Sequence, residues 1–104
     1  MFIFNTTFHV EGEVMEDSLS FFRKVYIPEV LESGEMRNPR LAYIHRQNDE
    51  EGHSLSLQFE VTDVETLNSW LQTNGHVLQQ KLVKQFGSKV AGFNTLLEEI
   101  EIGE

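Results

Sequence analysis

The chain opens with MFIFNTTFHV, in which alternate residues form two sides of different polarity. One side is apolar apart from a single threonine: Phe2, Phe4, Thr6, Phe8 and Val10. The other side is mostly polar: Ile3, Asn5, Thr7 and His9. A period of two is typical of a β-strand with one buried face. The pattern therefore predicts a strand over residues 2–10, with Thr6 as the one polar side chain that points towards the core.

The period changes to that of a helix after Gly12. Apolar residues then recur every three or four positions: Met15, Leu19, Phe22, Tyr26 and Val30. This spacing predicts an amphipathic helix, and Gly34 suits its C-terminal cap. Pro28 lies within the pattern and lacks the N–H that a helix interior uses. We therefore expect a kink there, or a helix that restarts at Pro28.

Two further strands follow, joined by the hairpin connection QNDEEGHS, in which Gly52 suits a left-handed bulge position. The later strand has an almost fully apolar side: His53, Leu55, Leu57, Phe59 and Val61. Its other side is polar: Ser54, Ser56, Gln58 and Glu60. The facing of the earlier strand, LAYIHRQ, depends on the hairpin bulge. Either Leu41, Tyr43 and His45 or Ala42, Ile44 and Arg46 face the helices.

A second helix and a last strand complete the pattern. Residues 62–65, TDVE, match a capping box that begins a helix. The apolar stripe of this helix keeps its phase across Asn74-Gly75: Val64, Leu67, Leu71, Leu78, Leu82 and Phe86. This predicts one long helix bent near Gly75, or two collinear helices, ending at Gly87. The stretch KVAGFNTLLEEI then forms the fourth strand.

The order β-α-β-β-α-β predicts a single α+β domain over residues 1–104, of the ferredoxin-like type. Such a domain is a four-stranded antiparallel sheet with both helices on one face. Right-handed crossovers place the first and third strands in the centre, the fourth beside the first and the second beside the third. The opposite, open face would then carry six polar side chains: Asn5, Thr7, His9, Ser56, Gln58 and Glu60.

This open face is the candidate ligand-binding site, although an antiparallel sheet often has one face in water. If two such faces meet in a dimer, they enclose a polar cavity. His9 is then the candidate general base, because imidazole titrates near neutral pH. Trp70 and Tyr43 each have a polar tip on an apolar body and could line a pocket, but Trp70 lies on the helix stripe and suits the core.

Composition and motifs narrow the chemistry. The net charge is −9, with 8 Lys and Arg against 17 Asp and Glu, which disfavours nucleic acid and anionic membranes as partners. There is no cysteine, which removes thiolate nucleophiles and Cys-ligated metals and fits a reducing compartment. The four histidines lack metal-ligand spacing, and neither a nucleophile elbow nor a glycine-rich nucleotide loop occurs, so we expect no metal or cofactor. The first residues lack the features of a signal peptide, which indicates a cytoplasmic protein.

Five stretches resemble blocks of a known family: FNTTFHVE, VYIPEVLESG, NPRLA, SLQFEV and GFNTLLEEI. They occur in the expected order and are similar to those of an uncharacterised bacterial family of stand-alone proteins of this length, a domain of unknown function. At fold level the family resembles the dimeric α/β-barrel group, in which two ferredoxin-like protomers press their open faces together. That group includes antibiotic-biosynthesis monooxygenase-like and haem-degrading proteins, and also stress-responsive proteins without known catalysis. The resemblance implies a homodimer through the open face, but a shared fold does not confer function.

Three functional hypotheses remain open. The preferred one is a non-enzymatic, dimeric binding or interaction module, because catalytic spacings are missing and the open face is partly polar. The second is a cofactor-independent monooxygenase or isomerase that holds a small metabolite in the open-face cavity, where Asn5 and Thr7 orient the substrate and His9 acts as general base. The third and weakest is a regulatory module that meets partners through the acidic hairpin around Glu50 and Glu51.

Overall fold

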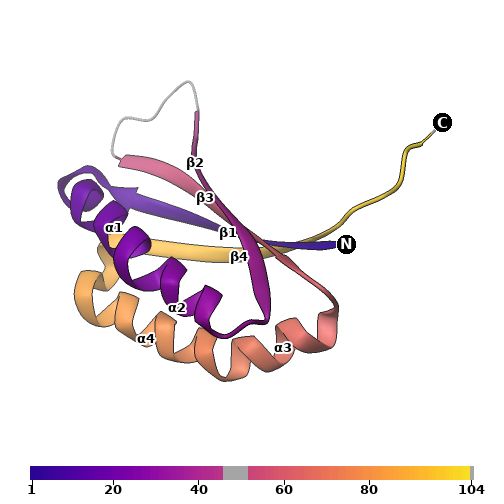
Figure 1. The fold of residues 1–104 in the computed structure, drawn as a ribbon. Coiled ribbons are helices and arrows are strands. Elements are labelled where there is room, and N and C mark those ends of the chain that lie inside the picture. The colour runs from indigo at the N-terminus through magenta and orange to yellow at the C-terminus, as the bar shows by residue number, and fades with distance from the viewer. Residues whose placement is uncertain (46–51, 104) are drawn as a thin grey trace.

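The computed structural model describes residues 1–45 and 52–103, and within them it has the predicted order of elements (Figure 1). The four strands are β1 (Phe2–Glu11), β2 (Met36–Ile44), β3 (Gly52–Val61) and β4 (Val90–Glu98). The helices are α1 (Met15–Phe21), α2 (Ile27–Glu32), α3 (Val64–Gln72) and α4 (Asn74–Phe86). Residues 46–51 of the hairpin connection, with Glu50 and Glu51, lie outside the described residues, and Gly52 already belongs to β3.

The sheet has the order β2-β3-β1-β4 and its pairs are antiparallel, which confirms the predicted ferredoxin-like α+β fold. All four helices lie on one side of this sheet (Figure 1). Between the two layers is a core to which the central strands contribute the apolar residues expected from their alternation: Phe4, Phe8, Val10, Leu55, Leu57, Phe59 and Val61. The helices add Phe21, Phe22, Tyr26, Val30, Leu67, Trp70, Leu78, Leu82 and Phe86.

The first helical region is interrupted just before Pro28. A π-helical turn, Phe22–Tyr26, separates α1 from α2, and Pro28 lies in the first turn of α2. The Ile27 N–H donates to the Phe22 carbonyl across this π-helical turn, so the helical backbone continues through it, and Pro28 follows the wider turn. The structure therefore has a change of helix type before Pro28, with α2 beginning at Ile27, rather than a separate helix that restarts at Pro28. Gly34 follows α2 with a φ of 73°, and its N–H donates to the Leu31 carbonyl at 3.1 Å, as expected of the capping residue.

The second helical region also consists of two helices, but the break lies at Thr73 rather than at Gly75. Thr73 has φ −109° and ψ −93°, and its hydroxyl donates to the Ser69 carbonyl at 2.8 Å. Such side-chain bonds compete with the helical ladder. Gly75 instead permits close packing: a Cβ atom on it would lie 2.8 Å from Cζ3 of Trp70. Gly87 ends α4 with a φ of 60°, as predicted.

The start of α3 differs from the predicted capping box. Asp63 is the N-cap residue, and its Oδ1 accepts from the Thr66 N–H at 2.7 Å. The hydroxyl of Thr62 accepts instead from Arg37 Nη1 at 3.3 Å. The cap is thus one residue later than the spacing of Thr62 and Glu65 suggests, because an aspartate carboxylate is itself a strong acceptor for the free N–H groups of a first turn.

The strand β2 turns Leu41 and Tyr43 towards the helices, which is the first of the two alternatives predicted from the sequence. Leu41 pairs with Leu57 and Tyr43 with Leu55, so both share the helix side of the sheet. The irregularity that determines this lies within β2, between Arg37 and Arg40, where Asn38 has a φ of 54°. One extra residue at this bulge keeps Met36 and Leu41 on the same side although they are an odd number of residues apart.

Candidate functional site

The open face of the sheet brings together the six residues predicted for it. Asn5 pairs with Gln58, Thr7 with Ser56 and Ile3 with Glu60 across the central strands. The side chains of three of them form a hydrogen-bonded cluster: Ser56 Oγ donates to Asn5 Oδ1 at 2.5 Å, and Asn5 Nδ2 donates to Thr7 Oγ1 at 3.1 Å. These three side chains therefore provide hydrogen-bond partners for one another within the single chain.

His9 lies towards one end of the same face, beside Ser54 on β3 and Ala91 on β4. The His9 side chain is exposed in the single chain, whereas Thr7 and Ser54 are buried. The role of His9 as a general base therefore depends on whether a second copy covers it.

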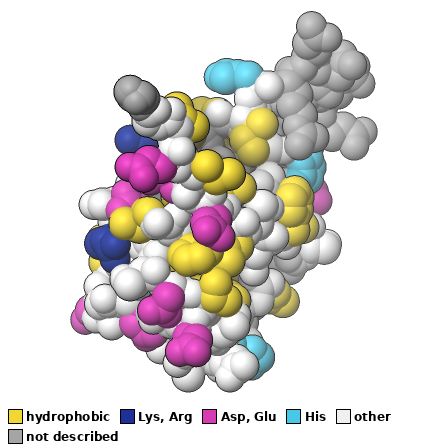
Figure 2. Space-filling model, turned by 90° about the vertical axis from the view of Figure 1, so that its right-hand side faces the viewer, with side chains coloured by type: hydrophobic (Ala, Val, Ile, Leu, Met, Phe, Trp, Pro, Cys, Tyr) yellow, Lys and Arg dark blue, Asp and Glu magenta, His cyan; other side chains and the backbone are white. Residues whose placement is uncertain are grey.

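The open face also carries apolar side chains that the sequence reading did not assign to it. On β4, Phe93 pairs with Thr7 and Leu97 with Ile3, which places both on this face. They are 63% and 43% exposed. The view in Figure 2, onto the right-hand side of Figure 1, shows hydrophobic side chains gathered at its middle, with more acidic than basic side chains around them. The open face is therefore partly apolar as well as polar.

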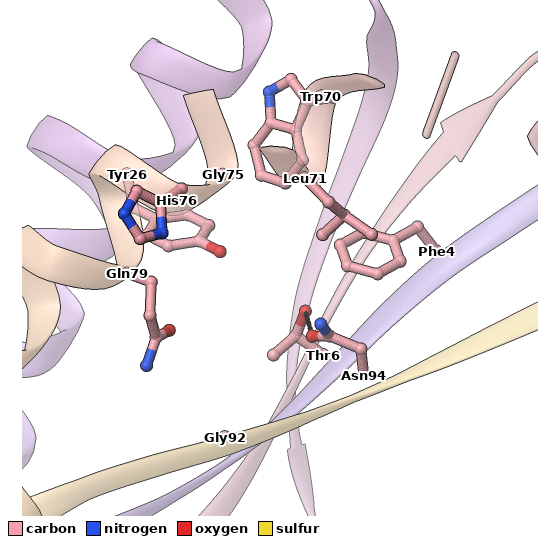
Figure 3. Close-up of a pocket in the computed structure, with 10 residues that line it drawn as sticks. All are labelled: Phe4, Thr6, Tyr26, Trp70, Leu71, Gly75, His76, Gln79, Gly92 and Asn94. Carbon is pink, nitrogen blue, oxygen red and sulfur yellow. Dashed lines mark hydrogen bonds between the residues drawn. The ribbon is translucent and has the colours of Figure 1, made fainter. Parts of the chain in front are cut away.

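A second candidate site lies on the opposite side of the sheet, between β1, β4 and the helices. It is a cavity of about 280 Å³ that opens to the surface (Figure 3). Ten residues line it: Phe4, Thr6, Tyr26, Trp70, Leu71, Gly75, His76, Gln79, Gly92 and Asn94.

Two features of the fold create this cavity. The helices cover the central strands closely but leave the helix side of β4 uncovered, so Asn94 and Leu96 there are exposed. Gly92 and Gly75 add no side chains of their own, so the rings of Phe8 and Trp70 can approach them closely. The π-helical turn ends at Tyr26, and its ring points towards the centre of the cavity (Figure 3). Turns of this kind are frequent at functional sites.

The lining combines aromatic rings with polar groups, and the polar groups provide most of the surface that a ligand could reach. Phe4 and Trp70 meet edge to face, with ring centroids 6.1 Å apart. Thr6 Oγ1 donates to Asn94 Oδ1 at 3.0 Å, which leaves the amide nitrogen of Asn94 free to donate to another group. His76 and Gln79, both exposed, project from α4 at the opening (Figure 3).

Tyr26 contributes a largely buried phenol to the cavity. Its side chain is 8% exposed, and burial raises the pKa of its phenol to about 12. Within residues 1–45 and 52–103, its hydroxyl has no hydrogen-bond partner. The phenol therefore stays protonated at neutral pH and offers a donor to whatever enters the cavity.

The electrostatics of the cavity favour a neutral ligand. None of its lining residues is a lysine, arginine, aspartate or glutamate. In the described part of the chain, no group of three or more His, Asp or Glu side chains is placed to hold a metal ion. The arrangement can bind a small uncharged molecule by apolar contact and a few hydrogen bonds.

Sequence reasoning identified part of this cavity without recognising it as a site. Thr6 points inward, as its place in the alternation predicts, and 6% of its surface is exposed. Trp70, a candidate pocket residue in the sequence, is 1% exposed. The missed signal was the pairing of Thr6 with the GFN stretch of the last strand. There, Gly92 leaves space and Asn94 supplies a polar partner at the same depth.

The fold and the two candidate sites define a small ferredoxin-like α+β protein with a ligand-sized cavity beside its sheet. The chain belongs to the family DUF4286, a domain of unknown function, whose model matches residues 1–100. The resemblance found in the sequence is therefore confirmed. No curated protein sequence matches the chain. Among the helices of residues 1–45 and 52–103, none is long and apolar enough to cross a membrane.

Several solved structures share the fold at low sequence identity. HapK from Hahella chejuensis is 11% identical with a TM-score of 0.72, and the match covers 100% of this chain and 97% of HapK. An ethyl tert-butyl ether D (EthD) family protein from Bacillus halodurans is 14% identical with a TM-score of 0.68, over 96% and 100% of the two chains. A dimeric ferredoxin-like protein from an uncultured marine organism is 14% identical with a TM-score of 0.62, over 97% of each chain. Identities of this size show a common fold alone.

Proposed function

We propose that this protein is a binding module that holds a small, uncharged, partly aromatic molecule in the cavity between β1, β4 and the helices. The observation that carries the proposal is the Tyr26 hydroxyl, which faces a cavity of about 280 Å³ and has no hydrogen-bond partner within the described residues. A ligand that accepts a hydrogen bond from this hydroxyl, in a cavity largely shielded from water, gains affinity.

The size and lining of the cavity narrow the ligand further. Its volume is near the lower end of the range for small-molecule sites, about 300–1,000 Å³, which suits a molecule with one or two rings. Phe4 and Trp70 provide aromatic surface for such a ring, and Tyr26 and Asn94 provide donors. A carboxylate or ammonium group would enter without a partner of opposite charge, at a high desolvation cost.

The tryptophan itself makes the test simple, because Trp70 is the only tryptophan in the chain and lines the cavity. We would titrate the protein with neutral hydroxylated aromatic probes, resorcinol and 4-hydroxyacetophenone, and follow Trp70 fluorescence, with benzoate as the charged comparison. The expected result is a saturable change with the neutral probes and weaker binding of benzoate.

Variants of the cavity residues then show whether the probes bind in this cavity. Tyr26→Phe and Thr6→Val each remove a hydroxyl from the cavity at nearly constant volume, and each should weaken binding by about two- to tenfold. Tyr43→Phe is the matched control, because Tyr43 is half exposed on β2 and does not line the cavity. A fluorescence change that does not saturate, or equal affinities in all three variants, would refute this function.

We also propose that the protein forms a homodimer through its open face. Phe93 and Leu97, exposed on that face in the single chain, support this assembly, because two such faces in contact would bury them. Molar mass from light scattering at several concentrations tests it, and Phe93→Asp should shift the protein to monomer. A wild-type protein that stays monomeric would rule out the dimer without affecting the cavity.

The enzymatic alternative uses the same dimer. If a second copy covers the Asn5–Thr7–Ser56 cluster, His9 would face an enclosed space in which a cofactor-independent monooxygenase or isomerase reaction could take place. Turnover of a small metabolite that is lost in His9→Ala but retained in Tyr26→Phe would favour this alternative over binding in the helix-side cavity.

A further inference from the structure

The sheet has two edge strands, β2 and β4, and they differ in how well they are protected against pairing with a further strand. The edge strand β2 has a bulge between Arg37 and Arg40, where Asn38 has a φ of 54° and is followed by Pro39. Bulges, prolines and charged side chains are features by which natural sheets protect an edge. The strand β2 is therefore a poor template for another strand.

The other edge strand, β4, has none of these features over residues 90–97, VAGFNTLL. This stretch contains no proline and no charged residue, and its pairing with β1 has no register shift. Every residue of β4 after Val90 is exposed, including Phe93 and Leu96, which lie on opposite faces of the sheet. Within the described part of the chain, no strand lies beside β4 on its outer side. A long, regular and uncharged edge of this kind is open to pairing with a further strand.

Charge favours a second copy of β4 as that strand, in the antiparallel direction. Lys89 directly precedes the strand, and Glu98 and Glu99 lie at its other end. An antiparallel copy centred on Asn94 brings Glu99 of each chain level with Lys89 of the other, whereas a parallel copy would bring the glutamates of both chains together. Lys89 Nζ lies 2.8 Å from Glu13 Oε1, but the Lys89 side chain is 46% exposed and its ammonium has further donors for a second carboxylate.

The side chains of β4 also fit this register. Each large exposed side chain of one copy lies opposite a smaller one of the other copy: Leu96 opposite Gly92, Leu97 opposite Ala91 and Phe93 opposite Thr95. The two Asn94 side chains lie opposite each other. Thr6 Oγ1 donates to Asn94 Oδ1 at 3.0 Å, which leaves the amide nitrogen of each Asn94 free to donate to the amide oxygen of the other.

We propose that β4 pairs edge to edge with β4 of a second copy of the chain, in the antiparallel register centred on Asn94. The two four-stranded sheets then form one continuous sheet. The twofold axis is perpendicular to this sheet, so the helices of both copies lie on one side and the contact closes at two chains. The contact goes beyond the open-face dimer, because it uses the backbone edge of the sheet. It also places the two helix-side cavities beside one axis, since Asn94 lines the cavity of each copy.

Disulfide formation tests the register, because the chain has no cysteine of its own. The two copies of residue 94 would have Cα atoms about 4.5–5.5 Å apart. This separation lies within the usual range for a disulfide, about 4.4–6.8 Å. The two copies of Leu96, on the same face, would be four residues apart along the strands, about 14 Å. Asn94→Cys should therefore form the symmetric disulfide several times faster than Leu96→Cys under mild oxidation, as measured by intact mass. Equal rates would overturn the pairing.

Molar mass in solution provides the second measurement. Asn94→Asp keeps the volume of the side chain and an acceptor for Thr6, but it sets two carboxylates directly opposite each other in the proposed pair. At a concentration at which the wild-type protein is assembled, this variant should have half the wild-type molar mass. Gln79→Glu is the matched control, because Gln79 is exposed on α4, and it should leave the molar mass unchanged.

The same measurement separates the edge contact from the open-face dimer. If both contacts form, Asn94→Asp converts a tetramer to a dimer, and if the edge contact forms alone, the variant converts a dimer to a monomer. A wild-type dimer that stays a dimer in Asn94→Asp would overturn the edge contact and leave the open-face dimer standing. A monomeric wild-type protein would overturn both contacts.

Discussion

The ring of Phe8 lies directly over Gly92, across the β1–β4 pair. The two residues are register partners, and a Cβ atom at position 92 would lie 2.8 Å from Cδ1 of Phe8 and 2.9 Å from its Cε1. Phe8 is 1% exposed and packs against Phe22, with ring centroids 4.7 Å apart, and edge to face against Tyr26. The ring therefore has little freedom to move away.

Gly92→Ala should consequently destabilise the protein. Gly92 is exposed, but the new Cβ would overpack the buried Phe8 ring, which costs about 1–3 kcal/mol, and the displaced Phe8 would also press on Tyr26 at the edge of the cavity. The free energy of unfolding from urea titrations measures the loss. Gly12→Ala is the control, because a Cβ at position 12 has no atom within 4 Å, and its stability should stay within about 0.5 kcal/mol of wild type. Equal stability of the two variants would contradict the packing of Phe8 on Gly92.

Gly75→Ala tests the packing of Trp70 on Gly75. At this position helix propensity alone predicts a gain in stability, whereas the packing predicts a loss. Within α4, alanine is favoured over glycine by about 1 kcal/mol. The new Cβ would, however, lie 2.8 Å from Cζ3 of Trp70 and 3.2 Å from its carbonyl oxygen. Since overpacking costs about 1–3 kcal/mol, we expect a net loss of about 1 kcal/mol and a shift in Trp70 fluorescence. A gain in stability would show that Trp70 does not lie on Gly75.

Asp63 should make α3 sensitive to acid. The Thr66 N–H donates to its carboxylate and holds the pKa of Asp63 below its ordinary value. A lowered acid pKa means that the stabilisation is present above the ordinary pKa and is lost as the pH falls through the lowered one. Tm measured from neutral to acid pH should therefore fall less steeply in Asp63→Asn, which keeps an acceptor but has no charge.

Two comparisons sharpen the Asp63 experiment. Thr62→Ala should leave the acid dependence of Tm unchanged, because Thr62 does not cap the helix. Glu13 acts in the same direction as Asp63, since the Lys89 ammonium, 2.8 Å away, also lowers the pKa of Glu13. The loss of stability at acid pH should therefore be smaller in Asp63→Asn than in the wild-type protein, but it should not disappear. If Asp63→Asn kept the acid slope of the wild type and Thr62→Ala lowered Tm at every pH, the capping box of the sequence would be the true cap.

The fold was predictable because its signals are local and repeated. The alternation in residues 2–10 and 53–61 and the stripes of both helical regions each determine which side of an element is buried, and together they leave one arrangement of strands. One error concerns a longer stretch, because β2 begins at Met36 and not at Leu41. The other errors lie where a single residue decides. The cap at Asp63 and the break at Thr73 depend on individual side-chain hydrogen bonds, and no periodic pattern records those.

The helix-side cavity was not predictable for a different reason. Thr6, Tyr26, His76 and Asn94 come from separate elements, and only the register of β4 against β1 and the π-helical turn bring them to one place. The six open-face residues, in contrast, lie on two adjacent strands of known alternation. Their shared face followed from the sequence, but what they bind stays a prediction.

The phenol of Tyr26 gives the most direct check on the cavity. Burial raises the pKa of Tyr26 from 10.0 to about 12, which means that the folded state disfavours the phenolate. For an acid with a raised pKa, the contribution to stability is complete below the ordinary value and is lost as the pH rises towards the raised one. The protein should therefore lose stability between about pH 10 and pH 12.

Tyrosinate absorbance in a Tyr43→Phe background would report this titration for Tyr26 alone, since the chain has two tyrosines. We expect the absorbance to rise only near pH 12 or together with unfolding. Absorbance that rose as it does for free tyrosine would mean that water already solvates the hydroxyl. The cavity would then lack the buried donor on which ligand binding is proposed to depend.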